Sequence, residues 1–247
     1  MSKQSSGLCR LCLSETLLVN SHIVPKFHYK PIKEEDGSYI VVSSNLDEKE
    51  SKGQKGETER LFCNDCDNRR LQKNEDHLAE VMFHKQLPGI DSPDLVEIQG
   101  YDYKKLKLAL LSILWRMSIT TRPIYRYVDL GPKHNERLRQ NLLKDEDLRE
   151  DEYPILLSIP FWDGVFFPNI LTTPYMFRAN GNRVYECLIS GLLFTFIVGA
   201  VPIEASFKVT MIRRDRWKMA KVPAEKNRLL WESMKKITHN FTTARSG

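Results

Sequence analysis

Two matched pairs of cysteines constrain this chain more than any other feature of its sequence. Cys9 and Cys12 form the first pair, and Cys63 and Cys66 form the second. Two thiolates with this spacing bind one side of a tetrahedral zinc ion, and a second pair completes the coordination shell. The sequence therefore predicts a closed structural zinc site with these four cysteines as ligands.

The rest of the sequence favours metal binding over disulfides. The chain has 247 residues and five cysteines, and its first residues are polar, unlike a signal peptide. A chain of this length can bury a core without the disulfides that small secreted domains need. We therefore expect a cytoplasmic protein with metal-bound thiolates, and an inert buried thiol at Cys187. The alternative is a redox-active pair, which the presence of two pairs disfavours.

The predicted fold class is α+β, in two regions. Residues 1–88 form a zinc-binding module with a polar insert at residues 30–59, in which residues 34–37 and 47–53 are expected as turns or disorder. Prolines near residues 88 and 93 mark the boundary. Residues 89–247 form a domain of helices and antiparallel sheet, which either positions nucleic acid or docks onto a partner protein.

Hydrophobic patterns place the main elements of the second region. The stretch 103–121 is apolar nearly all round, which predicts a helix buried on more than one side. Asn180 and Gly181 predict a hairpin turn between two strands. Seventeen uncharged residues at 187–203 contain glycine and proline and are too short to span a membrane, so they indicate buried sheet. We also expect a helix at 135–143, a C-terminal helix after Pro223, and strands at 154–159, 175–178, 183–189 and 192–198.

Charge is distributed unevenly along the chain. The formal net charge is +5, and residues 208–245 carry eleven Lys and Arg against three acids. An acidic cluster lies at 145–152. This asymmetry favours contact with a phosphate backbone or an acidic partner, although a solvated helix face is an equal alternative.

A second motif lies between the cysteine pairs. Ser21-His22-Ile23-Val24-Pro25-Lys26 follows Cys12, and a helix follows the second pair. In this order, residues 7–84 resemble the zinc-braced HNH endonucleases, and more closely a group of bacterial HNH-like proteins with Ser-His-Ile-x-Pro. The resemblance implies a treble-clef, ββα-metal fold, a general base at His22, one catalytic Mg²⁺ or Mn²⁺ ion, and a context in bacterial genome (antiphage) defence.

The metal shell departs from the pattern of this family. Ser21 stands where active members usually have Asp or His, and it is a poor Mg²⁺ ligand. By resemblance, Asp67 takes the ligand position after the second cysteine pair, with Glu59 or Glu75 as a second oxygen donor. The alternative role for His22 is a hydrogen bond inside the zinc module. We expect His28, His77 and His84 to be ordinary surface or helix-face histidines.

Basic residues supply candidate contacts to nucleic acid, which we expect to be DNA in the HNH context. Arg69, Arg70 and Lys73 follow the zinc site and could track phosphates. Arg213, Arg214, Arg216 and Trp217 combine charge with an aromatic ring that could stack on unpaired bases.

Two functions follow from these residues. The first is a metal-dependent HNH-type endonuclease that hydrolyses phosphodiester bonds, regulated by a partner protein and working as a homodimer where both strands are cut. The second is a catalytically inactive zinc module that binds protein or nucleic acid. No membrane partner is expected.

Overall fold

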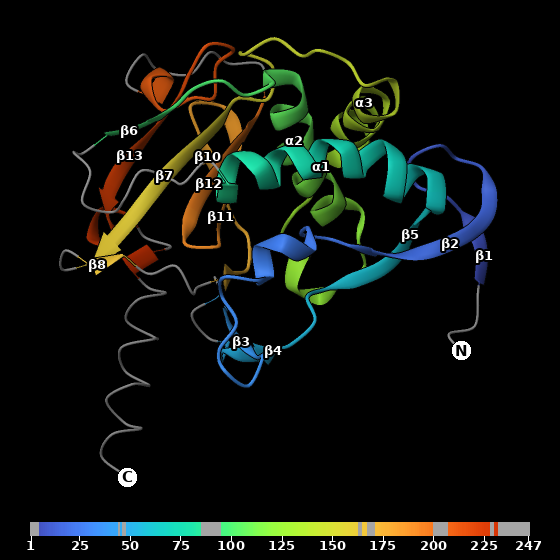
Figure 1. Cartoon of the computed structure of the whole chain (residues 1–247), viewed down its shortest axis with the longest axis horizontal. Coiled ribbons are helices and arrows are strands. Elements are labelled where there is room, and N and C mark those ends of the chain that lie inside the picture. The colour runs from blue at the N-terminus through green and yellow to red at the C-terminus, as the bar shows by residue number, and fades with distance from the viewer. Residues whose placement is uncertain are drawn as a thin grey trace.

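Three sheets and three α-helices make up the described part of this computed structural model, which confirms the α+β class (Figure 1). The structure describes residues 5–43, 45, 48–84, 95–162, 165–166, 171–199, 207–227 and 230–231. The predicted boundary at residue 88 and most of the predicted C-terminal helix lie outside these residues. Within them, no helix has both the length and the apolarity needed to cross a membrane.

The first sheet carries the two cysteine pairs. Its antiparallel strands lie in the order β1 (Ser5–Leu8), β2 (Glu15–His22) and β5 (Thr58–Cys63). The first cysteine pair lies in the turn between β1 and β2, where the Leu13 N–H donates to the Cys9 carbonyl at 2.9 Å. After β5 the chain enters the π-helical segment η2 (Cys66–Leu71) and then α1 (Gln72–Ala79).

The polar insert is more ordered than its composition predicts. It contains β3 (Tyr39–Val42) and β4 (Ser51–Gly53), which pair with each other, and β3 also pairs with β9 (Leu171–Thr172). The expectation of a turn or disorder at residues 47–53 is wrong over β4, whereas residues 34–37 form the expected turn, in which the Gly37 N–H donates to the Glu34 carbonyl at 2.9 Å. A partner strand from the second region completes the sheet, and local composition cannot reveal such a partner.

The large sheet has the strand order β10-β11-β12-β7-β13-β6, with β8 paired to β7. Its β7–β13 pair is parallel, and its other pairs are antiparallel. The predicted hairpin is confirmed, since Asn180 and Gly181 both have positive φ, at 49° and 80°. The strands are β6 (Leu95–Ile98), β7 (Ile155–Trp162), β8 (Val165–Phe166), β10 (Tyr175–Ala179), β11 (Asn182–Ile189), β12 (Leu192–Val198) and β13 (Trp217–Pro223).

Two longer helices belong to the second region. The predicted buried helix is α2 (Tyr103–Ile119), which begins where Asp102 accepts a hydrogen bond from the Lys105 N–H at 3.1 Å. The next, α3 (Gly131–Lys144), starts earlier than predicted because proline in its first turn needs no N–H partner. Short helical segments are η1 (Lys26–Tyr29), η3 (Glu80–His84), η4 (Pro123–Tyr125), η5 (Phe207–Val209) and η6 (Ala224–Lys226).

Helix α2 lies between the large sheet and the cysteine-bearing sheet (Figure 1). It is buried nearly all round, as its apolar sequence predicts, and one hydrophobic cluster includes residues of both predicted regions. Phe62 of β5 stacks on Trp115 of α2, with ring centroids 5.6 Å apart. The position of α2 therefore brings the second region directly against the strands that carry the cysteine pairs.

Candidate metal centre and catalytic site

The four paired cysteines converge on one point. The sulfur atoms of Cys9, Cys12, Cys63 and Cys66 all lie within 4.8 Å of one another, and the Sγ atoms of Cys12 and Cys63 are 4.0 Å apart. A tetrahedral ion with bonds of about 2.3 Å to sulfur needs sulfur atoms roughly 3.8 Å apart. The cluster could therefore hold a metal ion with little adjustment.

Backbone N–H groups donate hydrogen bonds to the cysteine sulfur atoms, which favours the thiolate form that binds a cation. The Cys63 N–H donates to Cys9 Sγ at 3.3 Å, and the Cys66 N–H donates to Cys63 Sγ at 3.4 Å. Burial acts to raise the pKa of Cys12, but hydrogen bonds involving Ser14 lower it to about 6. Burial raises the pKa of Cys9 and Cys66. A bound cation would lower the pKa of these thiols again, because thiolates rather than thiols bind metals.

His22 and Asp67 lie near each other in the structure. His22 is the last residue of β2, just after a β-bulge between Val19 and Asn20. Asp67 follows Cys66 in η2. The two side chains are close enough for each charge to alter the pKa of the other. Bulges often redirect side chains beside active sites, and this one precedes both Ser21 and His22.

The surroundings of His22 keep its imidazole neutral. Burial lowers its pKa, and the charges of Lys26 and Arg116 lower it further, whereas Asp67 and a hydrogen bond to the Lys55 carbonyl act in the opposite direction. A ring N–H that donates to this carbonyl leaves the other ring nitrogen free to accept a proton. His22 therefore has the protonation state that a general base requires.

Asp67 lies in a more enclosed position. Burial raises its pKa, and Arg116, the Ser21 hydroxyl and His22 oppose the rise. Ser21 is completely buried, and no hydrogen bond of standard geometry reaches its Oγ from the described residues. Ser21 thus faces Asp67 without adding a strong metal ligand.

Arg116 of α2 is the residue that sequence reasoning missed. It is only 1% exposed, its Nη1 donates to the His22 carbonyl at 2.7 Å, and its Nη2 donates to the Glu75 carboxylate. The available signal was a lone arginine within a helix that is apolar nearly all round. A buried arginine of this kind needs acceptors, but the sequence does not show where they lie.

The two carboxylates suggested as companions of Asp67 make other contacts. Glu75 forms the buried ion pair with Arg116. Glu59 accepts hydrogen bonds from the Thr121 N–H at 2.8 Å and from the Thr121 hydroxyl at 3.0 Å, and also from Thr120. Asp67 is therefore the one oxygen donor of the three whose described contacts leave it available to a cation.

The predicted phosphate contacts on the helix are paired with acids. Arg69 and Arg70 both contact Asp65, at 3.7 and 3.1 Å, and Lys73 contacts Asp145 at 3.0 Å. These pairs are partly exposed, so nucleic acid could still compete for the cations. The structure places all three residues on the surface after the cysteine cluster.

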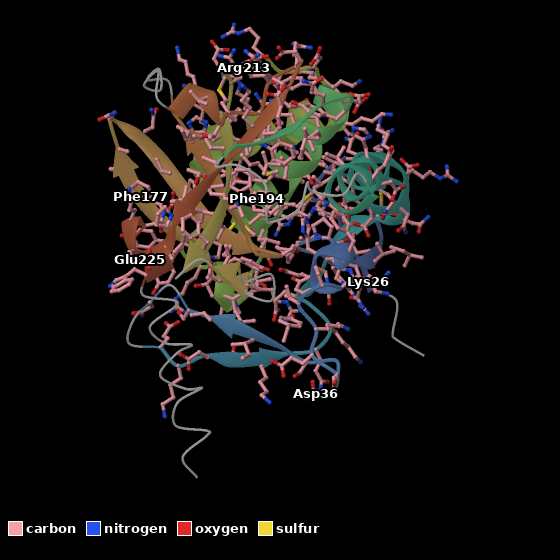
Figure 2. The ribbon with its side chains drawn as sticks, turned by 60° about the vertical axis from the view of Figure 1, so that its left-hand side comes forward. Lys26, Asp36, Phe177, Phe194, Arg213 and Glu225 are labelled. Carbon is pink, nitrogen blue, oxygen red and sulfur yellow. The ribbon has the colours of Figure 1, made fainter. Side chains whose placement is uncertain are left out.

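The basic stretch near the C-terminus lies elsewhere. Trp217 is completely buried and packs edge-on against Tyr101, so its predicted stacking on bases is wrong. Arg214 forms an ion pair with Asp147 at 2.8 Å. Arg213 lies at the top of Figure 2, well away from Lys26 beside the His22 segment. This stretch does not contribute to the site around His22.

Of the other histidines expected on the surface or on a helix face, His77 lies on α1 as expected, whereas His28 does not. His28 is completely buried, with Nδ1 3.1 Å from the Ser190 hydroxyl, so it is not a surface residue. His77 accepts a hydrogen bond from the Asp102 N–H at 2.9 Å and so helps to fix the start of α2. The side chain of His84 lies outside the described part of the structure.

Comparisons with models of protein families, with curated proteins and with solved structures found no match to this chain.

Proposed function

We propose that this protein is a metal-dependent HNH-type endonuclease with a structural zinc ion in the Cys9, Cys12, Cys63 and Cys66 cluster. The observation that carries the proposal is the proximity of His22 to Asp67, the residue that follows Cys66 of that cluster. A β-ribbon followed by a helix, with a histidine at the end of the ribbon, also suits a ββα-metal arrangement.

The chemistry assigns a separate task to each side chain. His22 takes a proton from a water molecule as the water oxygen attacks phosphorus and the bond from phosphorus to the leaving oxygen breaks. Asp67 would hold a Mg²⁺ or Mn²⁺ ion, which supplies positive charge to the departing oxygen when bound. Magnesium sites commonly use only one or two protein carboxylates together with substrate phosphate. A single available carboxylate therefore fits such a site.

The second candidate is a zinc module that binds nucleic acid or protein without catalysis. The buried Ser21 favours this function, because it replaces a usual ligand. The contacts of Glu59 and Glu75 favour it as well, since they leave Asp67 with no described carboxylate companion.

Cleavage assays test the proposal. Zinc-loaded protein is incubated with supercoiled plasmid, single-stranded DNA and RNA in the presence of Mg²⁺ or Mn²⁺. We expect at least one substrate to be cut, and His22→Ala to lower the rate at least about 100-fold, as expected for loss of a general base. His134→Ala is the matched control, because His134 is also partly buried and contacts Tyr153 instead of the site.

The outcomes separate the two candidates. Cleavage that His22→Ala abolishes, with zinc content and folding intact, supports the nuclease. Equal rates for wild type and His22→Ala would contradict the assigned general base. Binding of nucleic acid without cleavage of any substrate would favour the inactive module.

A further inference from the structure

We infer that Arg116 is a positioning residue for His22, through which α2 holds the general base in place; this inference rests on the proposed nuclease function. Arg116 belongs to the second region in sequence, yet its guanidinium lies inside the site of the first. Its 1% exposure means that the side chain does not contact substrate directly.

The contacts of the guanidinium reach three separate elements. Nη1 donates to the His22 carbonyl of β2 at 2.7 Å, and Nη2 donates to Glu75 of α1 and to Ser112 of α2, the latter at 3.1 Å. The hydrogen bond to the His22 carbonyl fixes the backbone of the residue that carries the imidazole. The ring itself is held by the Lys55 carbonyl. His22 is therefore secured at both its backbone and its ring.

The residues that follow α2 contact the same pair of strands, β2 and β5, at further points. Arg122 donates to the Thr58 carbonyl, and Thr58 is paired with His22 across β2 and β5. Thr121 and Thr120 bind Glu59 on the next residue of β5. These contacts lie at the catalytic end of the ribbon, so a small movement of α2 would move His22.

Glu75 supplies the counter-charge that makes this arrangement possible. An unpaired guanidinium in this environment would be very costly, and Glu75, itself 8% exposed, neutralises it. Glu75 therefore acts with Arg116 as a buried support and is not a ligand of the catalytic metal. The guanidinium Nε has no acceptor among the described residues, which leaves a donor for a buried water molecule.

The test uses the full zinc-loaded chain and three variants. Arg116→Met with Glu75→Leu replaces both charges by apolar groups of similar size, which a folded protein can tolerate. Arg116→Lys keeps the positive charge with fewer donors. Lys107→Met is the matched control, because Lys107 is a buried cation on the same helix that binds the Arg149 carbonyl at 2.5 Å and the Glu150 carbonyl at 3.2 Å.

Two readouts are taken for each variant. The first is kcat and KM for the substrate that the wild type cleaves, and the second is the NMR signal of the His22 ring. We expect the double variant to lower kcat about 100-fold with little change in KM, because small displacements of a catalytic group have effects of this size. Its His22 signal should shift, Arg116→Lys should restore part of both, and Lys107→Met should leave both unchanged.

Three results would overturn the inference. The first is a folded, zinc-loaded double variant with wild-type kcat and an unchanged His22 signal. The second is an equal loss of kcat in Lys107→Met, since the effect would then belong to α2 in general. If the double variant does not fold, the Arg116→Lys variant is used in its place. The third result would then be an Arg116→Lys variant with the kcat and the His22 signal of the wild type. Absence of cleavage by the wild type would count against the proposed function alone, because the His22 signal still reports on positioning.

Discussion

Individual side chains in this protein acquire their chemistry from partners that are distant in the sequence. The spacing of the cysteines was sufficient to predict which four sulfur atoms come together. Each pair is formed by residues close in the sequence, and only the contact between the two pairs joins distant residues. The burial of His28 could not be predicted in this way. Its partner Ser190 lies in the turn between β11 and β12, and nothing near His28 in the sequence indicates that contact.

Removal of one thiol tests the metal centre. We expect Cys12→Ser to lose bound zinc and much of the free energy of unfolding of the first region, since zinc binding in small modules is worth on the order of 10 kcal/mol. Metal analysis together with urea unfolding measures both effects. Cys187→Ser is the control, because Cys187 is buried and lies outside the cysteine cluster. Equal zinc content in Cys12→Ser and wild type would contradict the four-thiolate site.

The buried histidine makes stability depend on pH. Burial lowers the pKa of His28 to about 3, below its ordinary value of 6.5. Between these pH values the unfolded chain binds a proton at His28 and the folded chain does not, so stability falls as the pH falls through this window. We expect His28→Asn to reduce the slope of unfolding free energy against pH, by at most about 1.4 kcal/mol per pH unit.

Chemical denaturation at several pH values measures this slope. His134→Asn serves as the comparison, because His134 is less buried than His28 and should give a smaller change. An unchanged slope in His28→Asn would mean that His28 takes up its proton in the folded protein as readily as in the unfolded chain.

At the scale of elements, the sequence predicted best those helices and hairpins whose signal lies within their own residues. Helix α2 is nearly as predicted because its apolar residues run through several turns, and the β10–β11 hairpin follows from Asn180 and Gly181. Strand β13 was missed, although Trp217 and Met219 are buried and alternate with more exposed residues. Its neighbours β7 and β6 are remote in sequence, and the surrounding basic residues suggested a binding surface instead of a strand.

The buried ion pair between Arg116 of α2 and Glu75 of α1 predicts that a single and a double substitution differ in their effect on the free energy of unfolding. Arg116→Ala leaves Glu75 buried without its partner, and such a change typically costs about 3–5 kcal/mol. Replacement of both residues, as Arg116→Met with Glu75→Leu, should cost far less, because no unpaired charge remains. Urea unfolding of the two variants gives the comparison. Similar losses in both would indicate that the hydrogen bond to the His22 carbonyl, at 2.7 Å, supplies most of the stabilisation.

At the scale of the whole molecule, acidic and basic segments neutralise each other. The acidic cluster that the sequence showed at 145–152 contacts cations from several elements. Asp145 binds Lys73 and Lys104 at 3.0 and 2.7 Å, and Asp147 binds Arg214. The sequence showed both sets of charges but could not show that they pair, because pairing depends on how α1, α2 and the segment before β13 are arranged around the loop after α3.

This pairing predicts how nucleic acid binding responds to charge. Asp145→Asn releases Lys73 and Lys104, and asparagine tolerates the left-handed backbone of that position, where φ is 56°. If nucleic acid follows α1, affinity should rise, and the slope of log affinity against log salt should steepen by about 1 for each additional phosphate that the protein neutralises. Fluorescence anisotropy at several salt concentrations measures the slope. An unchanged slope would place nucleic acid on another surface.

The most direct test of a catalytic metal site at Asp67 does not depend on knowing the substrate. Electron paramagnetic resonance can count Mn²⁺ ions bound to the zinc-loaded protein and to its Asp67→Ala variant. We predict one weakly bound, displaceable Mn²⁺ in the wild type and none in the variant, with zinc retained in both. Wild-type protein that binds no Mn²⁺, or an Asp67→Ala variant that binds it equally well, would contradict a catalytic metal at this site.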